Sequence, residues 1–330
     1  MPNKEIIPRR VHQLTQAYIA MELEDAKEAG MLGYIARSVA QATMPHTDPK
    51  NMYFERTNGI ITLSMVAARP QIGLPYGSIP RILMGWICTE AVRTKEPVLY
   101  MGRSQADFLN KLQMEGNGAT IKRLRDQALR LFTSSITVTR ERGDEHGIEL
   151  ENLQIAKRSS IFWSPKNPNQ TSLWESTLQL NQDFFEEVIK APVPIDLRAY
   201  NALRKSPLAL DIYTWLTYRV FVMRAKGRSE VMIPWQALML QFGSNYGAGA
   251  EASDEDPAAA KKRRQAMYDF KRKFLARLKE VLLFYPEAKG AIRELDQGLL
   301  LRPAKLHIKQ AKPNTPHPFL SKRKASNGEG

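Results

Sequence analysis

The residues best suited to chemistry in this sequence are cations that recur at helical spacing. Between Lys261 and Lys279 there are nine basic residues and one acid, Asp269, which gives a charge of +8 over nineteen positions. Between Ala119 and Arg130 there are four basic residues and one acid. Such clusters can neutralise phosphate groups, and the salt dependence of binding rises with the number of phosphates contacted. The chemistry indicated is electrostatic recognition of a polyanion.

Residue sets for catalysis or for a cofactor are not recognisable in the sequence. No two of the five histidines are close enough for a metal pair or for the His-x-His of a strand-cutting initiator. The single cysteine, Cys88, can form neither an internal disulfide nor a thiolate zinc cage. The glycine-rich stretch 243–249 lacks the lysine of a phosphate-binding loop. We therefore predict no catalytic residues, no metal and no cofactor.

The overall composition places these cations in an ordinary globular protein. The chain has 330 residues, 48 Lys and Arg against 34 Asp and Glu, and a net charge of +14. No apolar run approaches the roughly 18 residues of a membrane span, and the first twenty residues hold no signal-peptide core. We expect a cytoplasmic protein with no membrane partner and two domains, on the scale of about 100–200 residues each.

The first basic cluster is predicted to lie on the second helix of a helix-turn-helix. The stretch 104–107 has capping-box form and begins a short helix. Gly116–Gly118 then makes a tight turn into a helix over 120–133, whose cations lie opposite its apolar face. A hairpin of alternating strands over 136–155 follows, with basic residues along it. We interpret this hairpin as the wing of a winged helix.

The second half of the chain repeats this order. An apolar helix over about 208–223 and a short helix over 234–242 precede a long basic helix from 257 to about 283. A closing hairpin over 291–302 ends the unit. The sequence therefore predicts an α+β protein with two winged-helix domains in tandem and an N-terminal helical extension.

The predicted domain boundaries follow the changes in pattern along the chain. Residues 1–50 form the N-terminal extension, with a helix over 12–43. Residues 51–190 form the first winged-helix domain, with a strand over 59–67 and a helix over 79–93 capped by Ser78. Residues 191–310 form the second, and 311–330 a disordered basic tail.

The candidate DNA-binding residues are the outward cations of the two basic helices, the basic residues of the hairpin and one glutamine. They are Lys122, Arg123, Arg125, Arg130, Arg140, Arg142, Lys157, Arg158, Lys262, Arg264, Gln265, Arg272, Lys273 and Lys279. The alternative for each helix is a solvated amphipathic surface. Residues 261–264 could also form a flexible phosphate clamp at the start of the long helix.

Several runs resemble the RepA family of bacterial plasmid replication initiators, over about residues 28–305. They are Leu74–Arg81, Thr89–Lys95, Gly102–Ser104, Ile121–Asp126, Asp183–Phe185, Ser206–Tyr218, Phe270–Arg272 and Tyr285–Pro286. The resemblance implies tandem winged-helix domains that bind iterons, which are repeated sites in a plasmid origin. It also implies monomers and dimers with different roles, and recruitment of the host initiator and helicase.

Taken together, the sequence predicts a non-enzymatic protein that binds double-stranded origin DNA specifically and helps to open it. Two linked domains that read one extended site raise the effective concentration of the second contact. The alternative is a winged-helix transcriptional repressor, possible also as an autoregulatory role of the same protein. A different class is an enzyme that acts on the origin, either a primase or a nickase, which would need an acidic cluster or a His pair beside a Tyr.

Overall fold

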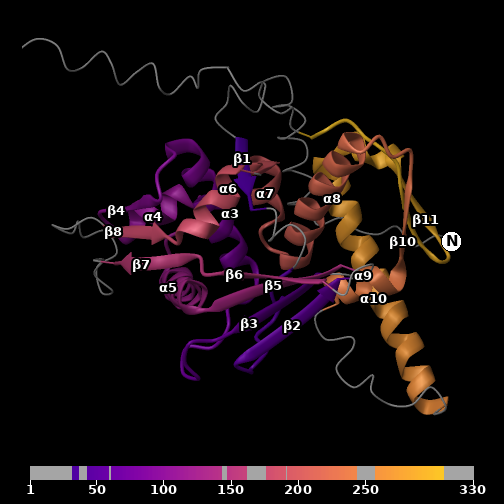
Figure 1. The fold of residues 1–330 in the computed structure, drawn as a ribbon, viewed down its shortest axis with the longest axis horizontal. Coiled ribbons are helices and arrows are strands. Elements are labelled where there is room, and N and C mark those ends of the chain that lie inside the picture. The colour runs from indigo at the N-terminus through magenta and orange to yellow at the C-terminus, as the bar shows by residue number, and fades with distance from the viewer. Residues whose placement is uncertain are drawn as a thin grey trace, which may run out of the picture.

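The computed structural model describes residues 32–36, 43–58, 61–142, 147–161, 176–190, 192–243 and 257–307. Its buried hydrophobic side chains form two clusters. One is drawn from residues 36–188, and the other from Ile35 and residues 193–304. Each cluster is the core of one helix-and-sheet unit, and the two units lie side by side in Figure 1, the first at the left and the second at the right.

The first unit is a winged helix built from three helices and a three-stranded antiparallel sheet. Its elements are α3 Ser78–Thr94, β4 Val98–Gly102, α4 Gln105–Lys111, α5 Gly118–Thr133, β7 Ala156–Ser160 and β8 Ser176–Leu180. The strands pair in the order β4-β8-β7, so that the strand after the first helix joins the last strand of the hairpin. The wing of this unit is therefore the pair β7 and β8.

The second unit has the same order of helices and strands, with a 3₁₀ helix added before its hairpin. Its elements are α8 Pro207–Ala225, β10 Val231–Pro234, α9 Trp235–Phe242, α10 Pro257–Phe284, the 3₁₀ helix η1 Pro286–Ala291, β11 Ile292–Leu295 and β12 Gly298–Leu301. The sheet order β10-β12-β11 again places the last strand beside the first. This repetition confirms the prediction of an α+β chain with two winged helices in tandem.

A separate four-stranded antiparallel sheet is inserted into the first unit. Its strands, in the order β2-β3-β5-β6, are Tyr53–Asn58, Ile61–Val66, Ser135–Arg142 and Gly147–Leu153. The hairpin β5–β6 was the predicted wing, and that prediction is wrong. Alternation identifies a strand with one buried face, but the sheet that the strand joins depends on contacts distant in the chain. The predicted strand over 59–67 is likewise one half of the hairpin β2–β3.

The segment between the units is structured rather than a simple linker. It contains α6 Gln182–Lys190, β9 Val193–Asp196 and α7 Leu197–Leu203. Strand β9 pairs with β1, Leu32–Ile35, so the helix predicted over 12–43 is wrong at these four residues. Pairing with a distant strand overrides the helical spacing of their side chains. Most of the remaining predicted helix lies outside the described residues.

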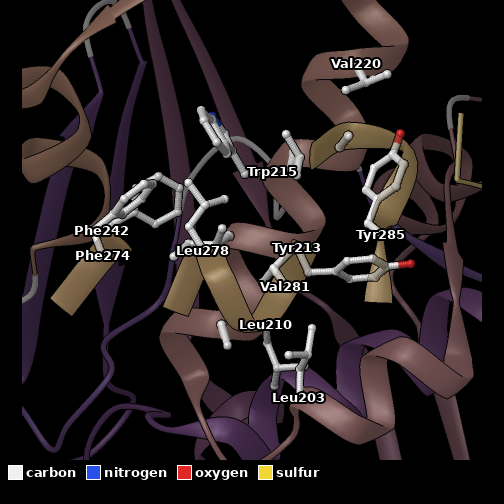
Figure 2. Packing of buried hydrophobic residues seen from close by; sticks show 14 of the residues in the cluster. Leu203, Leu210, Tyr213, Trp215, Val220, Phe242, Phe274, Leu278, Val281 and Tyr285 are labelled. Carbon is white, nitrogen blue, oxygen red and sulfur yellow. The ribbon is translucent and has the colours of Figure 1, made fainter. Parts of the chain in front are cut away.

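The core of the second unit explains why the long helix α10 docks where it does. Phe270, Phe274, Leu278 and Val281 recur at steps of three and four residues, and all are at most 3% exposed. Figure 2 shows Phe274, Leu278 and Val281 beside the α8 residue Trp215. The Trp215 and Phe274 rings meet edge to face at 6.4 Å between centroids. Burying each such side chain contributes about 1.5–3 kcal/mol, so this stripe fixes the rotation of α10.

Two local predictions in the first unit have opposite outcomes. Cys88 lies on the buried face of α3, and burial raises the pKa of its thiol, in keeping with a small apolar core residue. Ser78 does not cap α3, because the capping position is held by Gly77 at φ +77°, a conformation that glycine favours. Among the described helices, none is long and apolar enough to cross a membrane.

Candidate nucleic-acid interface

The first helix-turn-helix begins at two side-chain caps. Ser104 Oγ accepts a hydrogen bond from the Asp107 backbone N–H at 3.0 Å, which confirms the predicted start of α4. Asn117 Oδ1 accepts one from the Thr120 N–H at 2.8 Å and so caps α5. Gly102, just before α4, has φ +124°, and a Cβ there would lie 2.2 Å from the Asp107 carboxylate. A side chain at position 102 would therefore disturb the entry to the motif.

The turn between α4 and α5 is held by the connecting helix α7. Gln113 takes a left-handed conformation, with φ 51°, in this turn. Its side-chain Oε1 accepts a hydrogen bond from Asn201 Nδ2 at 2.7 Å, and its backbone carbonyl accepts one from Arg204. The position of α5 is thus tied to the segment that leads into the second unit.

Helix α5 buries Leu124, Ala128 and Leu131 and leaves Lys122, Arg123 and Arg125 exposed. With 100° per residue, the face opposite the core carries Lys122, Asp126, Leu129 and Thr133. Leu129 is 50% exposed. This face therefore mixes one cation, one acid and one apolar residue, with Arg123 and Arg125 on its flanks.

Arg130, a predicted DNA contact on α5, is engaged within the protein. Its Nε lies 2.9 Å from Asp126 Oδ2, and its Nη1 donates to the Leu74 carbonyl at 3.2 Å. Its guanidinium also lies over the Tyr76 ring, 5.3 Å from the centroid. These contacts pack α5 against the segment before α3.

The hairpin residues predicted to contact DNA lie on two different sheets. Lys157 and Arg158 are exposed on β7, the first strand of the wing. Arg140 and Arg142 belong to β5 of the inserted sheet, where Arg140 pairs with Glu149 in the strand register. The side chains of Arg140 and Arg142, and residues 162–175, lie outside the described residues.

Helix α10 presents a more uniform surface than α5. Five exposed residues recur at steps of four, three, four and seven positions on the face opposite its core. They are Lys261, Gln265, Tyr268, Arg272 and Lys279. The predicted contacts Lys262, Arg264 and Lys273 are also exposed and lie beside this stripe. The amino-terminal half of α10 extends away from the rest of the molecule, at the lower right of Figure 1.

Three exposed or groove-lining residues near α5 and α10 were not predicted from charge patterns. Tyr268 is 63% exposed in the middle of the α10 stripe. Arg204 and Lys205 line a groove of about 640 Å³ between the start of α3, helix α5 and the turn after α7, together with Arg123 of α5. The dipeptide Arg204-Lys205 before the start of α8 was a signal available in the sequence.

A buried ion pair joins the two winged helices. Arg81 on α3 donates two hydrogen bonds to the Asp211 carboxylate on α8, from Nε and Nη2, each at 2.7 Å. His46 Nε2 lies 2.7 Å from the same carboxylate. Arg81 is 2% exposed and also donates to the carbonyls of Met44 and Gly77. A bidentate pair of this kind fixes the angle between the helices that carry it.

Burial and charge act in opposite directions on this pair. Burial alone would raise the pKa of Asp211, but the Arg81 guanidinium and the hydrogen bond from His46 outweigh it, and the pKa is lowered. For His46, burial outweighs the attraction of Asp211, and the pKa is lowered below its usual 6.5. The cluster at neutral pH is therefore an Arg81–Asp211 ion pair with a neutral His46.

The described residues contain no group of three or more His, Cys, Asp or Glu side chains that could hold a metal ion. The candidate interface consists of helices α5 and α10, the wings and the groove lined by Arg123, Arg204 and Lys205.

Comparison with known proteins gives one family and two structures. The model of a family described as plasmid encoded RepA protein matches residues 74–237, which include Arg81 and Asp211 and end within α9. No match was found among curated proteins. The chain is similar to a crystal structure of selenomethionine derivatives of domains 2 and 3 of RctB, at 11% identity and a TM-score of 0.47, over 83% of this chain and 100% of that one. A second crystal structure of RctB domains 2–3 gives 12% identity and a TM-score of 0.44, over 82% and 98%.

Proposed function

Because residues 74–237 belong to the family of plasmid-encoded RepA proteins, we propose that this chain is a plasmid replication initiator that binds repeated double-stranded sites in an origin. The observation that carries the proposal is the repeated winged helix. Both units have the same sheet order, and in both the helix that would enter a major groove, α5 or α10, exposes cations.

The join between the units supports recognition of one continuous site. The Arg81–Asp211 pair and the contacts of Asn201 and Arg204 with Gln113 hold α5 in a fixed relation to the second unit. When one unit is bound, the other is presented to the neighbouring DNA at high effective concentration. Modest affinity of each unit then suffices for a tight complex.

The proposed mechanism is binding and deformation of DNA. Helices α5 and α10 each enter a major groove of the DNA. The wings and the cations Arg123, Arg204 and Lys205 contact phosphates. Several copies on adjacent repeats would strain the duplex beside them, and binding would supply the free energy for opening. Recruitment of the host initiator and helicase, and self-association on and off DNA, are further parts of this proposal.

The direct experiment is footprinting on the DNA that flanks the gene. The proposal predicts regularly spaced protected repeats of one sequence. Competition with unrelated duplex at about 150 mM salt provides the control, because non-specific electrostatic binding weakens steeply with salt. Protection that spreads evenly over all sequences would contradict the proposal.

We also propose that the protein cuts no DNA strand. Incubation with supercoiled origin plasmid and Mg²⁺ should leave the plasmid supercoiled, and the appearance of nicked circles would contradict this part of the proposal.

A repressor with the same fold is distinguished from an initiator by its function in cells. The initiator must support replication of a plasmid that carries only the origin repeats, whereas a repressor would only silence a reporter gene.

A further inference from the structure

Helix α10 carries one acid within its basic run, and that acid contacts two residues of the exposed stripe. Asp269 Oδ2 accepts a hydrogen bond from Gln265 Nε2 at 3.1 Å. Asp269 Oδ1 accepts one from Arg272 Nη2 at 3.4 Å. The two contacts run in opposite directions along the helix, four residues back and three residues forward. One carboxylate therefore contacts two long polar side chains of the stripe, Gln265 and Arg272.

Tyr268 lies between Gln265 and Arg272 along the same face. Its side chain is 63% exposed, the largest exposed fraction among the large hydrophobic residues of the described chain. The order along the helix is thus glutamine, tyrosine and arginine, with Lys261 and Lys279 at the ends of the stripe. This is a polar and aromatic centre with a cation at each end.

The three central side chains match the chemistry of base edges in a major groove. Glutamine pairs with the N6 and N7 atoms of adenine, and arginine pairs with the O6 and N7 atoms of guanine. An apolar ring surface contacts the methyl group of thymine. Lysines at the ends of such a stripe reach phosphates, which position the helix without reading sequence.

Resting on the proposed function, we propose that Gln265, Tyr268 and Arg272 form the base-reading group of the second unit, and that Asp269 is its positioning residue. Long side chains lose rotamer freedom when they are fixed on binding. Contacts with Asp269 restrict Gln265 and Arg272 before DNA arrives, so less freedom is lost on binding. The group favours a site that contains adenine, thymine and guanine within one groove.

The positioning role of Asp269 can be tested separately from the effect of its negative charge on DNA affinity. Removal of an acid from a cationic helix favours contact with any DNA, because it lowers repulsion of phosphates. The proposed role predicts the opposite effect on discrimination between sequences. Glu280 provides a matched control, because it forms an ion pair with Arg277 at the same three-residue spacing on α10 and lies outside the stripe.

The experiment first selects a duplex from a randomised library with the full-length wild-type protein. Affinities of the wild type, Asp269→Ala and Glu280→Ala are then measured for the selected duplex and for a scrambled duplex of equal length. We expect Asp269→Ala to reduce the ratio of the two affinities about fivefold or more, and Glu280→Ala to leave the ratio within about twofold of wild type. Circular dichroism melting confirms that both variants remain folded. Equal ratios for the two variants would overturn the role of Asp269, whereas failure of wild type to enrich any duplex would overturn the proposed function.

A second arm tests Tyr268 through the DNA. Each thymine of the selected duplex is replaced in turn by deoxyuridine, which removes only the methyl group. One replacement should lower wild-type affinity about threefold or more and leave the affinity of Tyr268→Ala unchanged. If no replacement distinguishes the two proteins, Tyr268 makes no methyl contact and this part of the inference is overturned.

Discussion

The two recognition helices occupy equivalent places in equivalent folds but present different chemistry. The outward face of α5 carries Lys122, Asp126, Leu129 and Thr133, with its acid contacted by a neighbouring arginine. The outward face of α10 carries three cations, a glutamine and an exposed tyrosine. The same topology thus presents two helix faces of different chemical composition.

This difference indicates a division of roles between the units. Helix α10 extends from its domain and has side chains suited to base edges, so we assign it the larger share of sequence discrimination. Helix α5 is braced by α7 and adjoins a groove lined by three cations, Arg123, Arg204 and Lys205, and by two acids, Glu115 and Asp126. These cations are suited to phosphates, so we assign the first unit mainly to grip and orientation.

The largest expected effect tests whether the two units form one body. Asp211→Ala leaves Arg81 buried without its carboxylate, and loss of one partner of a buried pair costs about 3–5 kcal/mol. Urea unfolding should show this loss in the free energy of unfolding. Glu90→Ala removes a surface partner of Arg93 and should cost about 0–1 kcal/mol. A similar small cost for Asp211→Ala would mean that the ion pair does not join the units.

A smaller effect, the dependence of stability on pH, should arise from His307 in the second unit. His307 Nδ1 lies 2.8 Å from the Tyr213 hydroxyl, and burial lowers the pKa of His307 to about 4. Below pH 6.5 the unfolded chain takes up a proton that the folded chain does not. Stability should therefore fall by about 1–2 kcal/mol between pH 6.5 and pH 5, with a slope that approaches about 1.4 kcal/mol per pH unit as the pH falls.

The variant His307→Gln isolates this contribution. Melting temperatures measured from pH 7.5 to pH 5 should depend less on pH in the variant than in the wild type. The remaining dependence comes in part from His46, whose pKa is also lowered. A wild-type profile without any decline in this range would contradict the assignment for both histidines.

The division between the helices is tested by one substitution on each. Arg272→Ala on α10 should lower affinity for the selected duplex about tenfold and affinity for the scrambled duplex much less, since a lost base contact costs about 1–3 kcal/mol. Fluorescence anisotropy titration measures both values. An equal loss on both duplexes would make Arg272 a phosphate contact and weaken the contrast between α10 and α5.

Lys122→Ala on α5 should have the smallest effect. If Lys122 contacts a phosphate, its loss lowers the slope of log affinity against log salt by about one and weakens binding to all sequences alike. Titrations at four salt concentrations provide the slope. A slope equal to that of wild type together with lost discrimination would assign Lys122 to a base edge instead.

Much of the fold follows from patterns within single elements. The apolar spacing of α3, α5, α8 and α10, the cap at Ser104 and the turn before α5 were sufficient to predict both helix-turn-helix motifs. The hairpins β5–β6 and β11–β12 were also predicted correctly, but the sheet that β5–β6 joins was not. Register and sheet membership depend on contacts between distant segments, so local patterns predict the wing one hairpin too early and a helix where β1 lies.

The candidate site was predictable to a smaller extent. Local clusters of basic residues identified the two basic helices. Charge alone, however, does not distinguish Arg130 from Arg272, although Arg130 is engaged by Asp126 and the Leu74 carbonyl. Tyr268 carries no charge, and aromatic residues on a helix are usually core. Only its position opposite Phe270 and Phe274 distinguishes it, and that requires knowledge of which face is buried. Arg204 and Lys205 line the groove beside α5 because they directly follow α7, whose position depends on the tertiary fold.

The central claim is that both units contact one continuous site and that α10 reads most of its sequence. Hydroxyl-radical footprinting of the selected duplex tests it most directly, with wild type, Arg272→Ala and the double variant Lys122→Ala, Arg123→Ala. The account predicts two protected blocks in the wild type, with loss of one block in Arg272→Ala and weakening of the other in the double variant. A single block, or variants that weaken the same positions, would contradict the account.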